Sequence, residues 1–213
     1  AKPSAPCTPA SLPPKVYTTC AVVGSAPSMA HLYQGGEIDS HDAVFRTNAH
    51  ALVATTGTKT TVRVAANAKQ LGAARRRDDG AQNLVPAASR CVPPGNLVRQ
   101  RDRVACVPAQ LLDAIYADSG VRFGAHILST GGLAIGLALH SCASVALYGF
   151  GGLQSYDHVL RDRHHDWRAE AAWIRRLVAE HRVADRTDRG VHLLRCESVA
   201  LLDHVEAQYQ GKP

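Results

Sequence analysis

Two adjacent histidines, His164 and His165, directly precede a stretch with helical periodicity. The helix is expected to begin at Trp167, because Asp166 can accept a hydrogen bond from a free backbone N–H there. A neutral imidazole can take up a proton, and the positive end of the helix disfavours a second positive charge beside it. His165 could therefore act as a general base, with Glu170 one turn further on to orient the ring or support the loop. A solvated helix start is the alternative.

Small residues and hydroxyl groups gather at two turns that each follow an expected strand. The turn 24–28 carries Ser25 and Ser28, and its small residues let the backbone approach a ligand. In the turn 129–132, Ser129 can cap a helix whose positive end favours an anion. Neither turn has the glycine spacing of a dinucleotide fingerprint or of a P-loop. Together they indicate a phosphate or nucleotide site, whereas each alone is compatible with an ordinary capped turn.

The stretch 37–42 places five polar residues around one isoleucine, next to an expected buried strand. Such a block must satisfy many polar groups, so it could be a set of catalytic carboxylates or a structural hydrogen-bond network. Asp39 and Asp42 alone do not make a metal site, and no Asp-x-Asp follows a strand. Two adjacent histidines also seldom face one ion, so no metal is expected.

Apolar strands alternate with amphipathic helices along the chain, which predicts an α/β fold with a mainly parallel, twisted sheet flanked by helices. In such a sheet, ligands bind at the carboxyl ends of the strands. A Pro-rich lead-in is expected over 1–14, one domain over 15–213, and irregular structure over 72–100. The expected strands are 20–24, 43–47, 61–65, 103–107, 144–149 and 191–194, and the expected helices are 109–118, 130–140 and 167–181.

The bulk composition is that of a globular chain of 213 residues with a net charge of +6. A basic chain favours anionic partners, but no basic stripe with interleaved aromatics is present, so nucleic acid is not expected. No apolar run is long enough to span a bilayer. The two tryptophans, Trp167 and Trp173, are expected to pack in the core or at its rim. The six cysteines form no CxxC pair and fit either disulfides or reduced thiols.

Several of these segments together resemble the motifs of the eukaryotic sialyltransferases, glycosyltransferase family 29. Residues 20–24, 36–42 and 46–48 resemble the large sialylmotif, and 129–131, 138–142 and 147–151 resemble the small one. His165 and Glu170, with four residues between them, match the short H-x4-E motif of the family. The motifs lie in family order over residues 20–170.

The resemblance implies a Rossmann-type, GT-A-like variant fold and an inverting transferase that needs no metal or other cofactor. The implied donor is CMP-sialic acid and the implied acceptor is a glycan. Family members are usually Golgi type II membrane proteins, so this chain is expected in the Golgi lumen, with its membrane anchor before Ala1. The family disulfide implies the pair Cys20–Cys142. Some relatives carry a second disulfide, which here implies the pair Cys7–Cys196. The remaining two cysteines are then expected to form the pair Cys91–Cys106.

The resemblance also assigns roles to individual residues. Ser25 and Ser28 fall where the family has asparagines that contact the nucleotide, whereas Asn48 matches the family residue. Gln154 replaces a histidine thought to meet the donor phosphate, and glutamine can donate a hydrogen bond but carries no charge. These replacements leave CMP-Kdo open as donor, and also a protein that binds nucleotide or glycan without turnover. The small-motif residues expected to hold the cytidine nucleotide are Ser129, Thr130 and Gly131.

Overall fold

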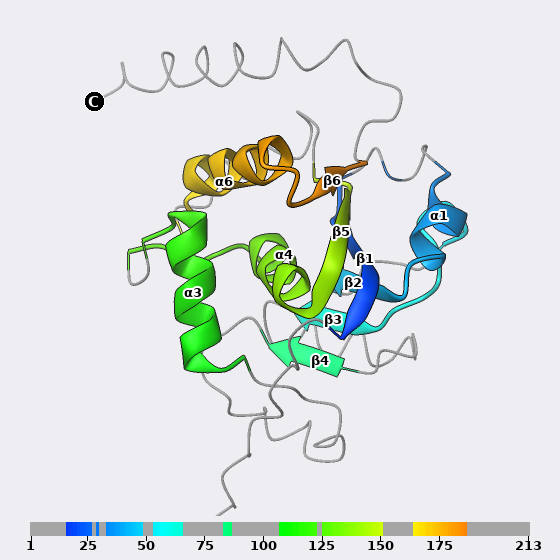
Figure 1. The fold of residues 1–213 in the computed structure, drawn as a ribbon, viewed down its shortest axis with the longest axis horizontal. Helices are drawn as coiled ribbons and strands as arrows, with labels where there is room; N and C mark the ends of the chain where they lie inside the picture. The colour runs from blue at the N-terminus through cyan, green and yellow to red at the C-terminus, as the bar shows by residue number, and fades with distance from the viewer. Residues whose placement is uncertain are drawn as a thin grey trace, which may run out of the picture.

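The described part of the chain is built around one parallel sheet of six strands in the order β4-β3-β2-β1-β5-β6. The strands are β1 (Tyr17–Val23), β2 (Ala43–Thr47), β3 (Val62–Ala65), β4 (Asn83–Pro86), β5 (Cys142–Tyr148) and β6 (Ala184–Asp185). Every pairing between neighbouring strands is parallel (Figure 1), which confirms the predicted α/β class. The computed structural model describes residues 16–26, 29, 33–48, 53–65, 83–86, 107–122, 125–150 and 164–186.

The strand order reverses beside β1. The chain runs outward from β1 through β2 and β3 to β4, and β5 then pairs with the opposite edge of β1. In open parallel sheets a ligand binds where the order reverses, outside the carboxyl ends of the two central strands. The ends of β1 and β5 are therefore the place to look for a site.

Helices cover both faces of the sheet. Alternate residues of a strand point to opposite faces, so Cys20 and Val22 join one core cluster and Ala21 and Val23 join the other. The first cluster packs under α3 (Ala109–Ser119), α4 (Thr130–Ser141) and α6 (Trp167–Ala179), and the second under α1 (Gly35–Asp39) (Figure 1). No helix in the described part of the chain is long and apolar enough to cross a membrane.

Most expected elements are confirmed, with small shifts at their ends. The strand 43–47 is found as predicted, and Trp173 lies in the core, 2% exposed. The prediction of irregular structure over 72–100 is wrong at β4, a four-residue strand whose order comes from pairing with β3 and not from any local pattern. Helix α1 and strand β6 were not predicted. The expected strand 191–194, most of 103–107 and the lead-in 1–14 lie outside the described residues, so the division into a lead-in and one domain stays a prediction.

A disulfide joins Cys20 in β1 to Cys142 at the start of β5, as the resemblance implied. The two Cα atoms are 6.1 Å apart across 122 positions of sequence. Closing so long a loop stabilises a fold by about 4–5 kcal/mol in the chain-entropy model. The bond fastens together the two strands whose far ends flank the point where the strand order reverses. The other four cysteines, Cys7, Cys91, Cys106 and Cys196, lie outside the described residues.

Candidate active site

The backbone turns after β1 and β5 lie in direct contact. Gly24 donates a hydrogen bond from its N–H to the carbonyl of Tyr148, at 2.8 Å, and Ala26 donates to the carbonyl of Gly149, at 3.3 Å. A Cβ added to Gly24 would fall on the carbonyl oxygen of Gly149. Gly149 itself has a φ of +72°, a left-handed backbone conformation that residues with a side chain rarely adopt. Small residues are therefore required where the two central strands end.

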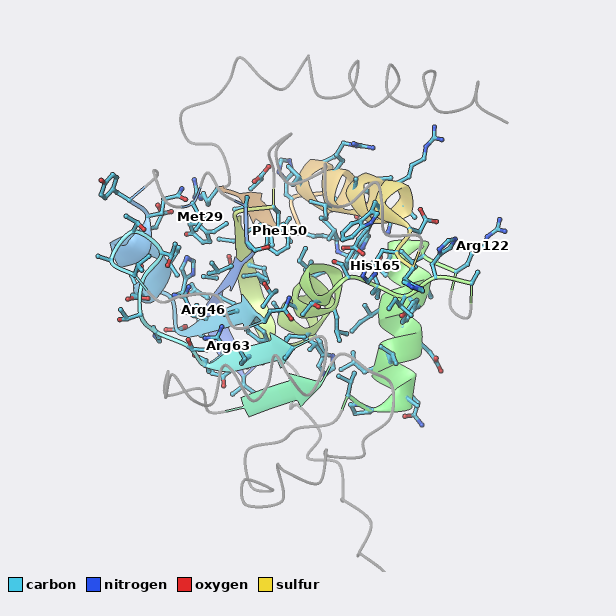
Figure 2. All side chains as sticks on the ribbon, turned by 180° about the vertical axis from the view of Figure 1, so that it is seen from behind. Met29, Arg46, Arg63, Arg122, Phe150 and His165 are labelled. Atoms are coloured by element: carbon cyan, nitrogen blue, oxygen red, sulfur yellow. A yellow bond between two sulfur atoms is a disulfide. The ribbon has the colours of Figure 1, made fainter. Side chains whose placement is uncertain are left out.

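The ring of Phe150 links this pair of turns to the start of α4. A Cβ built on Gly131 would lie 2.9 Å from the ring, and one built on Gly24 would lie 3.4 Å from it. Figure 2 shows Phe150 at the end of β5, near Met29. Phe150 was not among the predicted site residues, although it lies within the segment 147–151 that carries the family resemblance.

Ser129 caps α4, as predicted, and its side chain is buried. Its hydroxyl oxygen accepts a hydrogen bond from the N–H of Gly132, at 2.9 Å, and its carbonyl accepts one from Leu133. The first two helical N–H groups belong to Thr130 and Gly131, which are partly exposed. The helix dipole favours an anion at these two groups. Thr130 and Gly131 are thus better placed than the Ser129 side chain to contact a nucleotide.

Glu170 on α6 reaches across to this helix start and is only 4% exposed. One carboxyl oxygen accepts a hydrogen bond from the backbone N–H of Ser129, at 2.9 Å, and the other forms a short hydrogen bond with the Ser129 hydroxyl. A Cβ on Gly132 would lie 2.7 Å from the carboxyl carbon. Burial raises the pKa of Glu170, although the hydrogen bonds from Ser129 and the nearby His165 oppose the shift. Glu170 thus supports the turn at Ser129, and its predicted role beside His165 stays a prediction.

His165 is held by the segment that leads into Ser129. Its Nδ1 lies 2.7 Å from the carbonyl oxygen of Ile127, and the N–H of Ile127 donates to the carbonyl of His164 at 2.9 Å. Because a carbonyl only accepts hydrogen bonds, Nδ1 carries the proton and the lone pair of the neutral ring lies on Nε2. The Trp167 ring meets the imidazole edge-on, with centroids 4.8 Å apart. Figure 2 shows His165 near the start of α6.

The predicted start of α6 is also confirmed. The Asp166 side chain accepts a hydrogen bond from the N–H of Ala169, at 2.9 Å, and the helix begins at Trp167. Since this cap sets the backbone of the residue next to His165, it helps to fix where the imidazole lies.

Within the acidic stretch 37–42, the contacts of the two aspartates favour the structural network over catalytic carboxylates. Asp39 accepts hydrogen bonds from the backbone of Thr58, at 2.7 and 3.1 Å, and of Lys59, at 3.0 Å. It also lies 3.6 Å from the guanidinium of Arg46, whose pKa burial lowers to about 10. Asp42 accepts from the N–H groups of Thr18 and Thr19, at 3.1 and 3.0 Å. These carboxylates hold turns and strands in place.

Of the remaining predicted residues, the structure describes Ser25 and Asn48. Ser25 follows Gly24 and is exposed at the end of β1. Asn48 directly follows β2 with a φ of +48°, and its backbone is tied to β3 by Val64 and by the buried Arg63. Ser28 and Gln154 lie outside the described residues. Within the described ranges, no three His, Cys, Asp or Glu side chains group as metal ligands.

A parallel sheet with tight glycine turns where its order reverses, and a helix N-terminus beside them, is typical of a nucleotide-binding α/β protein. The sequence profile of glycosyltransferase family 29 (sialyltransferase) matches residues 2–87 and 96–182. The chain therefore belongs to this family and is an enzyme, a glycosyltransferase that transfers sialic acid.

Solved structures share the fold. A crystal structure of a mammalian sialyltransferase is 23% identical, with a TM-score of 0.61, over 81% of this chain and 70% of that chain. The sialyltransferase CstII from Campylobacter jejuni, in complex with cytidine-5'-monophosphate, is 10% identical, with a TM-score of 0.56, over 82% of each chain. The arrangement of the sheet is thus shared with proteins whose sequences have diverged widely.

Proposed function

We propose that this enzyme transfers sialic acid from CMP-sialic acid to a glycan hydroxyl, with inversion, without a metal, and with His165 as the general base. The observation that carries the proposal is the contact between His165 Nδ1 and the Ile127 carbonyl. It leaves the basic lone pair of a neutral ring on Nε2, the nitrogen that must receive the proton.

The reaction needs one base and one leaving group. The acceptor O–H bond breaks as its proton passes to Nε2 of His165, and the oxygen bonds to the anomeric carbon of the donor. The bond from that carbon to the phosphate oxygen breaks on the opposite face, and its electron pair leaves with CMP. A single displacement from the opposite face inverts the anomeric configuration.

The start of α4 suits the phosphate of the donor. Thr130 and Gly131 present helix N-terminal N–H groups, and Gly24 and Gly149 keep the neighbouring turns free of side-chain bulk. Burial favours the neutral form of Glu170, so this carboxyl competes less with the phosphate for the positive helix end. This arrangement supports an anionic leaving group beside α4.

The comparisons support this choice of substrates. One related structure is the mammalian enzyme in complex with Gal-beta-1-3GalNAc-ortho-nitrophenol, and another is CstII with CMP-3FNeuAc. CMP-Kdo is the second candidate donor, because the exposed Ser25 stands where the family has an asparagine and reaches less far toward a nucleotide. The Golgi lumen is the proposed location, and the Cys20–Cys142 disulfide supports an oxidising compartment.

The decisive experiment measures CMP release from CMP-Neu5Ac and from CMP-Kdo, with β-galactoside, sialylated and pectin-type acceptors and with EDTA present. We expect acceptor-dependent release from CMP-Neu5Ac that EDTA does not reduce. Release from CMP-Kdo alone would change the donor, and loss with EDTA would overturn the metal-free mechanism. A folded protein that binds CMP but releases none from either donor would instead be a binding protein.

The base is tested by His165→Ala. Loss of a general base lowers kcat by about 10²–10⁴-fold, whereas CMP binding should stay within about twofold. His126→Ala is the matched control, because His126 precedes Ile127 and is not assigned to the chemistry. Transfer that survives in His165→Ala would show that another group takes the proton.

A further inference from the structure

Trp167 contacts His165 but leaves its own polar group unused. The two rings meet edge to face, with centroids 4.8 Å apart and planes at 63°. The indole N–H of Trp167 is buried and has no hydrogen-bond partner in the described structure. Since a buried donor without an acceptor lowers stability, hydrogen bonding by the indole does not explain why a tryptophan stands here.

The second tryptophan of the chain shows the usual arrangement. Trp173, on the same helix, is 2% exposed, and its indole N–H donates to Asp118 at 3.1 Å. Asp118 also pairs with Arg176 and Arg182, so Trp173 belongs to a network that joins α3 to α6. Trp173 stabilises the packing of helices, whereas Trp167 lies against the proposed base.

The geometry of the imidazole shows what a neighbouring ring can contribute. The hydrogen bond from Nδ1 to the Ile127 carbonyl fixes one edge of the ring, and such a bond does not by itself set the tilt of the imidazole plane. A flat aromatic neighbour restricts this tilt because it excludes many orientations of the imidazole plane. A base must be held within a narrow range of geometry to take a proton efficiently.

We propose that Trp167 is a positioning residue for His165: its ring holds the imidazole so that Nδ1 stays on Ile127 and Nε2 faces the acceptor hydroxyl. The inference rests on the proposed function, because it requires His165 to be the base. Trp167 need not touch either substrate.

The test compares Trp167→Leu, Trp167→Phe and Trp173→Phe. Trp167→Leu should lower kcat about tenfold or more, with the KM of the CMP-sugar within about twofold. Trp167→Phe keeps a flat ring and removes the unpaired donor, so it should restore kcat to within about threefold without lowering Tm. Trp173→Phe loses the hydrogen bond to Asp118, so it should lower Tm and leave kcat unchanged.

A second readout does not depend on turnover. Long-range ¹H–¹⁵N spectra of the histidine rings report which nitrogen carries the proton, and His165→Ala identifies the His165 signals. We expect the Nδ1–H form in the wild-type chain and in Trp167→Phe, and a shifted or mixed pattern in Trp167→Leu.

The outcomes separate the two proposals. If His165→Ala transfers sugar normally, the assigned base is wrong, whatever the Trp167 variants do. If His165→Ala is inactive but Trp167→Leu keeps both kcat and the ring spectrum, the base stands and the positioning role is overturned. A fall in kcat of Trp167→Phe that tracks a fall in Tm would also overturn it, since that is what a structural residue does.

Discussion

Two polar regions of this molecule use their side chains differently. In the Asp39 cluster (Asp39, Arg46, Thr58 and Lys59), the carboxylate accepts backbone hydrogen bonds, and Arg46 donates to the carbonyls of Thr56 and Lys59. In the base loop (Ile127, Ser129, His165, Trp167 and Glu170), hydrogen bonds fix Glu170 and one side of His165, and the indole N–H of Trp167 has no partner in the described structure.

The difference shows how to separate scaffold from site. The Asp39 cluster is the richer in charge, yet its groups are used to hold the chain, and burial alone accounts for the lowered pKa of Arg46. The base loop has fewer charges, and its contacts with Ile127 and Trp167 hold an imidazole, a group that can accept a proton. Figure 2 shows Arg46 and His165 well apart in the molecule. Changes in the first region should therefore alter stability, and changes in the second should alter transfer.

Asp39→Ala should give the largest loss of stability. It leaves Arg46, whose side chain is 5% exposed, without its carboxylate partner, and two backbone N–H groups without an acceptor. Breaking such a pair costs about 3–5 kcal/mol, measured by chemical or thermal unfolding. Asp113→Ala, at an exposed position on α3, is the control and should change stability by under about 0.5 kcal/mol. Asp39→Ala should still transfer sugar below its melting temperature. Loss of transfer in folded Asp39→Ala would show that the Asp39 cluster takes part in the reaction.

Gly24→Ala should lower stability less than Asp39→Ala does, but it should also weaken nucleotide binding. The new Cβ falls on the Gly149 carbonyl oxygen, so the two turns must move apart, at about 1–3 kcal/mol. Because this movement shifts the proposed nucleotide turns, CMP should bind more weakly in calorimetry. In Gly36→Ala the Cβ meets nothing within 4 Å, and this variant should be as stable as the wild type or slightly more so. Equal CMP affinity in both variants would exclude the β1 turn from the nucleotide site.

The same contrast explains what could be predicted from the sequence. Strand 43–47 and the cap at Asp166 follow from local patterns, which act over a few residues. Strand β4 and the partners of Asp39 depend on residues brought together only by folding, so no pattern within 72–100 or 37–42 could decide them. Phe150 was missed because its position between Gly24 and Gly131 joins three segments far apart in sequence.

The dependence of stability on pH offers the finest comparison, and it centres on Glu170. Burial raises the pKa of this carboxyl above its usual 4.5. As pH rises past that usual value, the Glu170 carboxyl loses its proton in the unfolded chain while it still keeps it in the folded chain. The contribution of Glu170 to stability is therefore complete below the usual value and is lost as pH rises through the folded pKa, at no more than about 1.4 kcal/mol per pH unit.

Glu170→Gln should remove this dependence with little other effect. An amide has the same shape as the neutral carboxyl, so it can accept from the Ser129 N–H and donate to its hydroxyl, and transfer near neutral pH should stay within a few-fold of wild type. The variant should match the wild type at low pH and become the more stable of the two as pH rises. Glu180→Gln, an exposed change at the opposite end of the same helix, is the control and should not reproduce this gain in stability with pH. A stability gap between Glu170→Gln and wild type that stays constant from pH 4 to 8 would contradict the raised pKa of Glu170. A neutral Glu170 could then no longer explain why the start of α4 is open to a phosphate.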